Sequence, residues 1–262
     1  MPSKLSVAII TLNEESNITR TLSSVRFADQ IVIVDSGSTD RTLEITASFN
    51  ATTFREPWRG FAAQKNFALD QCTGDWILSL DADEELTPEL QAEIQTLLSG
   101  NPSADAYLLR RRNLFLGRWI CHGGYYPDPK LRLFRRYAAN FAPPARFTDR
   151  PVHETIALEG TLETLDHDLI HHAYPTIESY VEHLNRYSTL GAQTAHIKGQ
   201  GDSSAPTLLY NVLLSPAASF FQGYIFKRGF LDGREGFLLH LYHAFYLSWQ
   251  SAKAWQTAHN KR

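Results

Sequence analysis

Short apolar runs alternate with amphipathic segments over the first hundred residues. Runs of four to six apolar residues bounded by polar ones are typical of buried strands, and apolar residues recurring every three to four positions are typical of helices. The expected strands are Leu5–Ile10, Ile31–Val34, Ala51–Arg55 and Trp76–Leu80, and the expected helices are Glu15–Val25, Thr39–Phe49, Gly60–Gln71 and Thr87–Leu98. This alternation predicts an α/β protein with a doubly wound, mostly parallel sheet.

The pattern changes after Asn101. Strand signals recur at Ala106–Arg111 and Leu131–Phe134, but glycine, proline and aromatic residues interrupt the rhythm. A long helix is predicted over Ile177–Ile197, and the aromatic-rich segment Thr207–His259 is also predicted to be helical. We therefore expect a catalytic domain over 1–198, with a nucleotide-binding part (1–100) and an acceptor or catalytic part (101–198), then a linker (199–206) and a helical extension (207–262).

Composition narrows the class of protein. The chain has 262 residues, 43% of them hydrophobic, which is enough for a substantial core, and its formal net charge of −3 argues against nucleic acid as a partner. Its two cysteines, Cys72 and Cys121, do not make a disulfide framework. No apolar run approaches the ~20 residues that span a bilayer. These features predict a cytoplasmic protein with reduced thiols.

Polar clusters follow the first two predicted strands. Thr11, Asn13 and Glu14 come directly after the first strand, and Asp35 begins a Ser-Gly-Ser-Thr-Asp turn after the second. In open α/β sheets, ligands bind outside the carboxyl ends of the strands. A single polar turn of this kind is more often a helix cap, but two in adjacent units favour a binding site.

A third cluster, Asp81-Ala82-Asp83, follows the strand Trp76–Leu80. Side chains alternate along an extended strand, so Asp81 and Asp83 are expected to point the same way. Two carboxylates on one side of a strand end repel each other unless a cation lies beside them. The pair therefore predicts a divalent metal, Mg²⁺ or Mn²⁺, with a substrate diphosphate completing its shell. The alternative is a solvated acidic turn that includes Glu84 and Glu85.

Taken together, these clusters resemble the family-2 glycosyltransferases with a GT-A fold. The resemblance covers about the first 90 residues and rests on Thr11–Glu14, Val34–Asp40, Gln64–Ala68 and Leu80–Glu84. It implies a Rossmann-like sheet with flanking helices and an enzyme that transfers a hexose from a UDP-sugar. By this resemblance, Thr11, Asn13, Glu14 and Asp35 surround the base and ribose, Lys65 lies near the base or diphosphate, Asp81 holds the ribose or a metal-bound water, and Asp83 ligates the metal.

The later part of the chain resembles a narrower group, the bacterial glucosyltransferases of lipopolysaccharide core assembly. The matching segments are Lys130–Arg135, Val152–Glu154 and Gly229–Gly233. This resemblance implies transfer of glucose, with inversion, to a cell-envelope glycolipid or oligosaccharide acceptor such as the lipopolysaccharide inner core. It also implies that Glu154 is the base that deprotonates the acceptor hydroxyl. The alternative for Glu154 is a carboxylate in a surface salt bridge.

Two further groups of residues are candidates for the site. His171 and His172 follow a strand-like apolar pair, and one of them, which we assign as His171, could be a further metal ligand that favours Mn²⁺. A buried, hydrogen-bonded histidine is the alternative. Lys130, Arg132 and Arg135 are expected to line one face of a strand and to meet an anionic donor or acceptor.

The C-terminal segment has a chemistry of its own. Aromatic residues crowd residues 220–249, with Lys227 and Arg228 near the middle. Aromatic residues beside basic ones fit a helix that lies on a membrane surface, which would place the enzyme peripherally on the inner face of the membrane. The alternative is ordinary packing onto the catalytic domain or a second subunit.

Other functions compete with the main one. The same fold could transfer sugar to a polyprenyl phosphate or a protein acceptor, or the chain could be a non-catalytic nucleotide-binding module. A dinucleotide-dependent oxidoreductase is disfavoured because no Gly-x-Gly-x-x-Gly sequence follows the first strand.

Overall fold

The computed structural model describes residues 3–137, 145–148, 155–157, 160–197 and 204–259. They form two compact units, which we call the α/β unit and the helical unit. The α/β unit contains residues 3–112 and the described part of 128–172. The helical unit contains residues 113–127 and the described part of 173–259.

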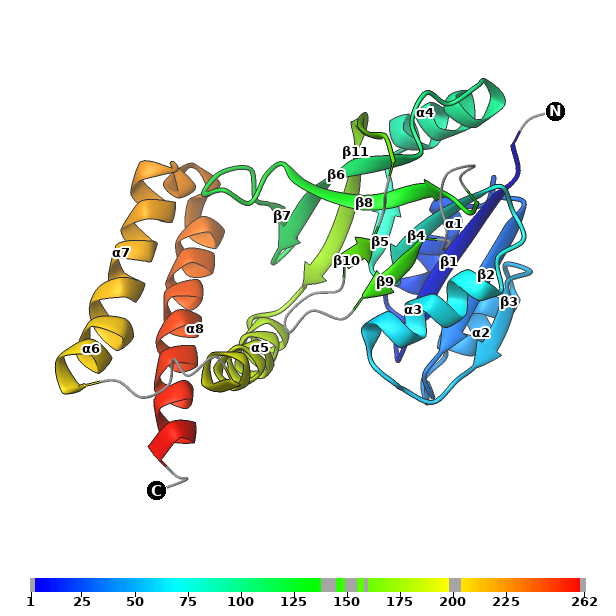
Figure 1. The fold of residues 1–262 in the computed structure, drawn as a ribbon. Coiled ribbons are helices and arrows are strands. Elements are labelled where there is room, and N and C mark those ends of the chain that lie inside the picture. The colour runs from blue at the N-terminus through cyan, green and yellow to red at the C-terminus, as the bar shows by residue number, and fades with distance from the viewer. Residues whose placement is uncertain (1–2, 138–144, 149–154, 158–159, 198–203, 260–262) are drawn as a thin grey trace. The chain divides into compact units, whose positions relative to one another are not determined.

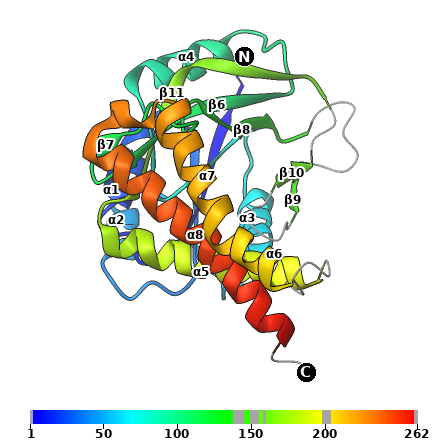
Figure 2. The same cartoon turned by 90° about the vertical axis from the view of Figure 1, so that its left-hand side faces the viewer.

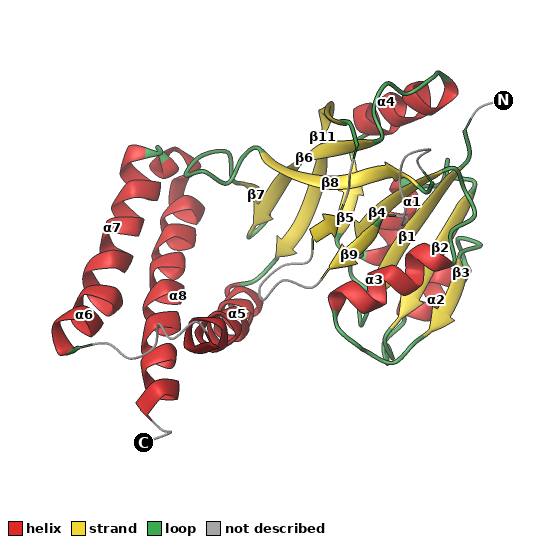
Figure 3. Cartoon of the chain, in the orientation of Figure 1, coloured by secondary structure: helices red, strands yellow, loops and turns green. Residues whose placement is uncertain are grey.

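The α/β unit is built around one large sheet (Figures 1 and 3). Its strands are β1 (Leu5–Thr11), β2 (Gln30–Asp35), β3 (Thr52–Arg55), β4 (Trp76–Asp81), β5 (Glu84–Leu86), β6 (Ala106–Phe115), β8 (Asp128–Arg135) and β11 (Leu162–Tyr174), and β9 (Arg146–Thr148) pairs separately with β10 (Thr155–Ala157). Its helices are α1 (Ile18–Ser24), α2 (Thr42–Ala47), α3 (Phe61–Asp70) and α4 (Pro88–Ser99). The distal ends of β6 and β11 continue into the helical unit.

The sheet is mixed rather than parallel throughout. Its order among the described strands is β3-β2-β1-β4-β8-β6-β11-β5, and β7 (Arg118–Trp119) pairs with β6. The strands β3, β2, β1 and β4 run parallel to one another, whereas β8 runs antiparallel to both β4 and β6, and β5 runs antiparallel to β11. The expectation of an α/β sheet with flanking helices is confirmed. The antiparallel orientation of β8 and β5 was not predicted from the alternation of strands and helices in the sequence.

Apolar side chains cover both faces of the central strands. On one face, Val7 and Ile9 of β1 pack with Ile18 and Leu22 of α1 and with the buried side of α4. On the other face, Ala8 of β1 packs with residues of β2 and with α3. Burial on both faces explains why these strands are almost continuously apolar in sequence.

Helix starts follow local side-chain chemistry. The helix α4 begins as expected, because the hydroxyl of Thr87 accepts a hydrogen bond from the N–H of Leu90 and Pro88 occupies the first turn. The helix α2 begins three residues later than expected, at Thr42. There, the carboxylate of Asp40 accepts from the N–H and the hydroxyl of Thr42, which holds Asp40 in a turn before the helix.

The described residues of the helical unit are mostly helical. Its elements are α5 (Ile177–Ile197), α6 (Ala205–Leu209), the π-helical turn η1 (Tyr210–Leu214), α7 (Ser215–Phe221), the π-helical turn η2 (Gln222–Phe226), the 3₁₀ turn η3 (Gly229–Asp232) and α8 (Gly233–His259). Helices α7 and α8 lie side by side (Figure 2). The predicted helical character of the C-terminal segment is confirmed.

Glycines allow close packing inside the helical unit. The imidazole of His240, only 4% exposed, lies against Gly123, Gly223 and Gly229, where a side chain would overlap the ring. Gly236 likewise lies against the carbonyl oxygen of Gly229. The glycine-rich stretch after Arg228 is therefore explained by packing between η3 and α8.

The compact units do not follow the domain limits expected from sequence. Helix α5 lies in the helical unit, although sequence analysis assigned it to the catalytic domain. The expected linker overlaps residues 198–203, which are outside the described residues, and α6 begins at Ala205. The domain limits stay a prediction. No helix in the described part of the chain is both long and apolar enough to cross a membrane.

Candidate active site at the carboxyl ends of the strands

The loops after β1 and β2 are tied together by side-chain hydrogen bonds. The N–H of Asn13 donates to the hydroxyl of Ser38 over 2.8 Å, and the side-chain oxygen of Asn13 accepts from the N–H of Thr39 over 2.8 Å. The N–H of Glu14 donates to Thr42 over 2.8 Å. Asn13 adopts a positive φ of 55°, which asparagine tolerates better than most residues. Two of the predicted site residues, Asn13 and Glu14, are thus held beside the loop that follows Asp35.

Asp35 is fully buried at the end of β2. Its carboxylate accepts hydrogen bonds from the N–H of Gly37 and from the N–H and hydroxyl of Ser38. Asp35 therefore shapes its own turn. In β1, Thr11 is the parallel partner of Asp35, and its hydroxyl is buried with no hydrogen-bond partner among the described residues. A buried hydroxyl without a partner at a strand end is consistent with a ligand that completes its bonding.

Asp81 is held by two cations. Its Oδ1 lies 2.8 Å from Nζ of Lys65, and its Oδ2 contacts the guanidinium of Arg132. Burial alone would raise the pKa of Asp81, but the charges of Arg132 and Lys65 outweigh burial and hold that pKa well below its usual range. Lys65 and Asp81, both predicted site residues, are therefore brought together, and both oxygens of Asp81 already have partners.

Glu84 is buried next to Asp81 and Arg132. Its side chain is completely buried, and it contacts Arg132 at 2.6 Å and Arg111 at 3.2 Å while accepting from the N–H of Asp81. The reading of Glu84 as part of a solvated acidic turn is wrong for this residue. Sequence analysis missed Arg111 and Glu84 as parts of the site, and the only local signal was the acidic run that follows Asp81.

Asp83 lies beside His171, with 3.3 Å between Oδ2 and Nε2. The strand β4 ends at Asp81, and Asp83 lies in the turn before β5. The expectation that Asp81 and Asp83 lie on one extended strand and point the same way is therefore wrong, because Asp83 lies beyond the strand and the two carboxylates have different partners. Antiparallel pairing of β11 with β5 sets His171 opposite Glu84, which brings its imidazole to Asp83.

Glu14 adds a third carboxyl to this group, and we call Glu14, Asp81 and Asp83 the acidic cluster. Burial raises the pKa of Glu14 from 4.5 to about 7; a hydrogen bond from Asn17 opposes the rise, and the charges of Asp83 and Asp81 add to it. Burial would also raise the pKa of Asp83, but the charge of His171 and its hydrogen bond lower it. Glu14 therefore keeps its proton to a higher pH than Asp83 does.

The neighbouring histidine has a different role. Nδ1 of His172 lies 2.9 Å from the guanidinium of Arg20, and Nε2 lies 2.9 Å from the carboxylate of Glu85. Both ring nitrogens are therefore engaged by side chains. Of the two candidate histidines, only His171 contacts a carboxylate of the acidic cluster.

The expected basic strand face is not formed. Arg132 is buried against Asp81, whereas Arg135 lies over the ring of Trp76, with 4.7 Å to its centroid. Lys130 pairs with Asp128. Lys130 and Arg132 are two residues apart, so their side chains lie on the same face of β8. Arg135 is three residues after Arg132, so the alternation of side chains along the strand places it on the other face. The predicted base, Glu154, lies outside the described residues.

The residues present fit a divalent cation at Asp83 and His171. A carboxylate and an imidazole are both ligands that Mn²⁺ accepts, and they already lie within contact distance. Over the described residues, no group of three or more His, Cys, Asp or Glu side chains could hold a metal. Such a cation would therefore take its other ligands from substrate phosphate and water, which is usual for Mg²⁺ and Mn²⁺ in nucleotide sites.

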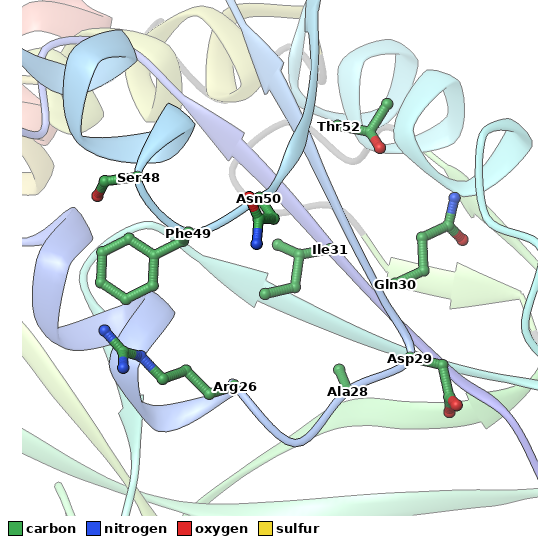
Figure 4. A pocket seen from close by; sticks show the side chains of 9 residues that line it. All are labelled: Arg26, Ala28, Asp29, Gln30, Ile31, Ser48, Phe49, Asn50 and Thr52. Atoms are coloured by element: carbon green, nitrogen blue, oxygen red, sulfur yellow. The ribbon is translucent and has the colours of Figure 1, made fainter.

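A hollow elsewhere in the α/β unit is not lined by any residue of the acidic cluster or by His171. Its volume is about 460 Å³, and it is lined by residues that include Gln30, Phe49 and Thr52 (Figure 4). Gln30 and Thr52 begin β2 and β3, so the hollow lies at the amino ends of the strands. In parallel sheets, ligands bind at the opposite, carboxyl ends, where the acidic cluster lies.

Comparison with known proteins identifies the family. Residues 6–142 match the model of the family "Glycosyl transferase family 2". An uncharacterized glycosyltransferase of Rickettsia bellii is 32% identical over 94% of this chain and 84% of that protein. The lipopolysaccharide core biosynthesis glycosyltransferase LpsC of Rhizobium meliloti is 31% identical over 96% of this chain and 92% of that protein.

A solved structure shares the fold. The mannosyltransferase PcManGT from Pyrobaculum calidifontis, described in complex with GDP-Man and Mn²⁺, has a TM-score of 0.55 at 18% identity, covering 97% of this chain and 87% of that one. The match with the family model covers Thr11, Asp35, Lys65 and the acidic cluster, all of which lie between residues 6 and 142. The chain therefore belongs to glycosyl transferase family 2.

Proposed function

We propose that this glycosyltransferase is a metal-dependent, inverting enzyme that transfers a hexose, with glucose the favoured sugar, from a UDP-sugar to a cell-envelope glycolipid such as the lipopolysaccharide inner core. The observation that carries the proposal is the contact between Asp83 and His171 at the carboxyl end of the sheet, beside the loops of β1 and β2. The name of the Rhizobium relative supports the choice of acceptor.

We assign roles to the chain's own residues on the basis of their contacts and of the family resemblance. Asp83 and His171 would hold the cation, which when bound would act as a Lewis acid toward the departing diphosphate. Lys65 and Arg132 hold the carboxylate of Asp81 in place, so its position does not depend on a bound metal. Asn13 and Thr11 would contact the nucleoside, and Asp35 keeps the turn beside them in shape.

Acceptor activation is assigned to Glu154. A carboxylate placed opposite the departing diphosphate would remove the proton of the acceptor hydroxyl as the new glycosidic bond forms. Direct displacement with a single base inverts the anomeric centre. The support for Glu154 is the resemblance of the Val-His-Glu segment at 152–154, since this residue lies outside the described part of the chain.

The experiment is a binding titration followed by a transfer assay. Calorimetry with UDP, UDP-glucose and GDP-mannose, each with and without Mn²⁺, measures donor choice and metal dependence. We expect UDP compounds to bind more tightly with Mn²⁺, and Asp83→Asn to remove that gain. The exposed Asp166 of β11 supplies a matched control, because Asp166→Asn makes the same chemical change away from the cluster. Equal affinity with and without metal would overturn the metal assignment.

The transfer assay separates the competing functions. Glu154→Gln should keep nucleotide affinity and lose transfer to a glycolipid acceptor, because only the proton acceptor is removed. Loss of nucleotide binding in this variant would contradict its role as a base. Transfer to a polyprenyl phosphate or a protein but not to a glycolipid would show that the acceptor belongs to one of those classes. Nucleotide binding without any transfer would show that the chain is a non-catalytic nucleotide-binding module.

A further inference from the structure

The helical unit exposes an uncharged helical segment of unusual composition. Between Asp202 and Lys227 the sequence contains no Asp, Glu, Lys, Arg or His. Within it, α6, η1, α7 and η2 run without interruption from Ala205 to Phe226. A helix that faces water normally carries charged residues on its outer side. The absence of charge along this segment therefore requires an explanation.

Large apolar side chains of this segment face outward. We call the following seven the apolar ridge: Leu209, Tyr210, Leu213, Leu214, Phe221, Ile225 and Phe226. Their exposed fractions range from 45% for Ile225 to 79% for Phe226. Soluble monomers rarely expose contiguous apolar patches of this kind without a partner for them. The ridge is therefore a candidate contact surface.

The inner side of the same segment is already used. Pro216 and Gly223 are buried, and the ring of Phe220 packs against Phe237 of α8, with 5.9 Å between centroids. Helices α7 and α8 run side by side in two perpendicular views (Figures 1 and 2). The ridge residues are thus the side of the segment that α8 leaves uncovered, and folding of the helical unit does not account for them.

Positive charge borders one end of the ridge. Lys227 and Arg228 follow Phe226 directly, and Arg234 lies just beyond η3; all three are exposed. The acidic residues nearby are engaged: Asp232 is buried against His122, and Glu235 lies 3.6 Å from Arg118. The free charge at this end is therefore positive.

Two exposed apolar residues lie among these cations. Phe230 and Leu231 of η3 are 46% and 49% exposed, and the turn that carries them is fixed by a hydrogen bond from the N–H of Leu231 to the carbonyl of Arg228. We call Lys227, Arg228, Phe230, Leu231 and Arg234 the basic turn. Apolar side chains interleaved with lysine and arginine fit the boundary between lipid headgroups and acyl chains.

We propose that the apolar ridge and the basic turn bind the surface of a lipid bilayer that contains anionic phospholipids. The segment lies in the plane of the interface, with ridge side chains in the acyl boundary and the basic turn among the headgroup phosphates. The proposal deepens the proposed function, because an enzyme that acts on a membrane glycolipid gains from a surface that holds it there. Lipid binding itself needs neither donor nor acceptor, so it is tested separately.

The experiment is co-sedimentation of the full chain with sucrose-loaded vesicles of phosphatidylcholine alone or mixed with phosphatidylglycerol. We expect binding to the mixed vesicles that weakens as salt is added. Phe226→Ser should weaken binding to them about tenfold, because it removes one large apolar side chain from the interface. Leu162→Ser is the matched control, since Leu162 of β11 is 49% exposed but lies outside the ridge, and it should bind as the parent does.

A second pair of variants tests the charge. The double change Lys227→Gln with Arg228→Gln should weaken binding to anionic vesicles about 30-fold, at about 1 kcal/mol for each cation, and should change binding to neutral vesicles little. Arg228 has a positive φ of 62°, and glutamine leaves that backbone strain as it was. The control removes two exposed arginines of the α/β unit, Arg41→Gln with Arg59→Gln, and should leave binding unchanged.

Several outcomes would overturn the proposal. One is failure of the parent chain to sediment with anionic vesicles, and another is equal loss in Phe226→Ser and Leu162→Ser. A dimer in sedimentation velocity that dissociates in Phe226→Ser, without vesicle binding, would assign the ridge to contact between two copies of this chain. Far-UV circular dichroism checks that each variant is folded. Calorimetric UDP binding in the absence of lipid distinguishes failure of this proposal from failure of the proposed enzyme function.

Discussion

Glu14 gives the sharpest test of the electrostatics at the candidate site. Burial raises the pKa of its carboxyl from 4.5 to about 7 in the folded chain. Below pH 4.5 the carboxyl is protonated in both folded and unfolded chains, so it costs the fold nothing. As the pH rises toward 7 the unfolded chain loses this proton while the folded chain keeps it, and stability falls. Above pH 7 the loss is complete.

The size of this effect follows from the two pKa values. The difference between 4.5 and about 7, at about 1.4 kcal/mol per pKa unit, corresponds to a loss of about 3 kcal/mol. Glu14 is partly exposed, so screening by water makes this an upper value. Between pH 5 and pH 8 the expected change is about 2 kcal/mol, because part of the loss has already occurred at pH 5.

The perturbation is Glu14→Gln, which removes the ionisation and keeps an oxygen to accept the hydrogen bond from Asn17. Urea unfolding of parent and variant, followed by circular dichroism at several pH values without metal or nucleotide, measures the difference in unfolding free energy. The variant should become more stable relative to the parent by about 2 kcal/mol as the pH rises from 5 to 8.

The control is Glu182→Gln, at an exposed position of α5, whose difference from the parent should stay constant over the same range. A difference for Glu14→Gln that also stays constant with pH would refute the reasoning, because it would mean that Glu14 ionises alike in folded and unfolded chains. A difference that changes in the opposite direction would mean that the ionised form is the one the fold stabilises.

Three further changes test the surroundings of the site and the packing of each unit. Arg132→Met leaves the buried Glu84 and the half-buried Asp81 without their shared cation and should lower the stability of the α/β unit by about 3–5 kcal/mol in thermal unfolding. Thr87→Ala removes the N-cap of α4 and should cost about 1 kcal/mol, seen as a fall in Tm that Thr87→Ser largely avoids. Gly236→Ala places a methyl group on the carbonyl oxygen of Gly229 and should destabilise the helical unit by about 1–3 kcal/mol, while calorimetry shows UDP affinity unchanged.

The sequence identified the parts of the fold that depend on local pattern. The parallel strands β1, β2 and β4 are continuous apolar runs because both faces are covered, and that signature is visible in any window that contains them. The strand β11 was recognised only at its apolar pair, Leu169 and Ile170. Much of the rest of β11 is polar, and buried Asp168 is compensated by Arg112 from β6, a partner far away in sequence.

The candidate site also contains residues that could be predicted from the sequence and contacts that could not. Thr11, Asn13, Asp35, Asp81 and Asp83 were identifiable because they follow strands, and strand ends meet at one edge of a parallel sheet. The partners of these residues were not identifiable. Whether Asp81 meets a metal or an arginine depends on β8 lying antiparallel beside β4, and whether His171 or His172 meets Asp83 depends on the register between β11 and β5.

The two aspartates of the Asp-Ala-Asp sequence therefore have different partners, and we expect this difference to decide which of them meets a cation. Asp81 pairs with Lys65 and with Arg132, which also contacts Glu84, so the negative charge of Asp81 is compensated before any ligand arrives. Asp83 has only the imidazole of His171 beside it among the ion pairs of the described residues. We therefore expect a cation at this edge of the sheet to bind Asp83, which has no lysine or arginine partner among the ion pairs of the described residues. The cations buried under Asp81 would keep that neighbour from competing for the same ion, because both of its oxygens are already engaged.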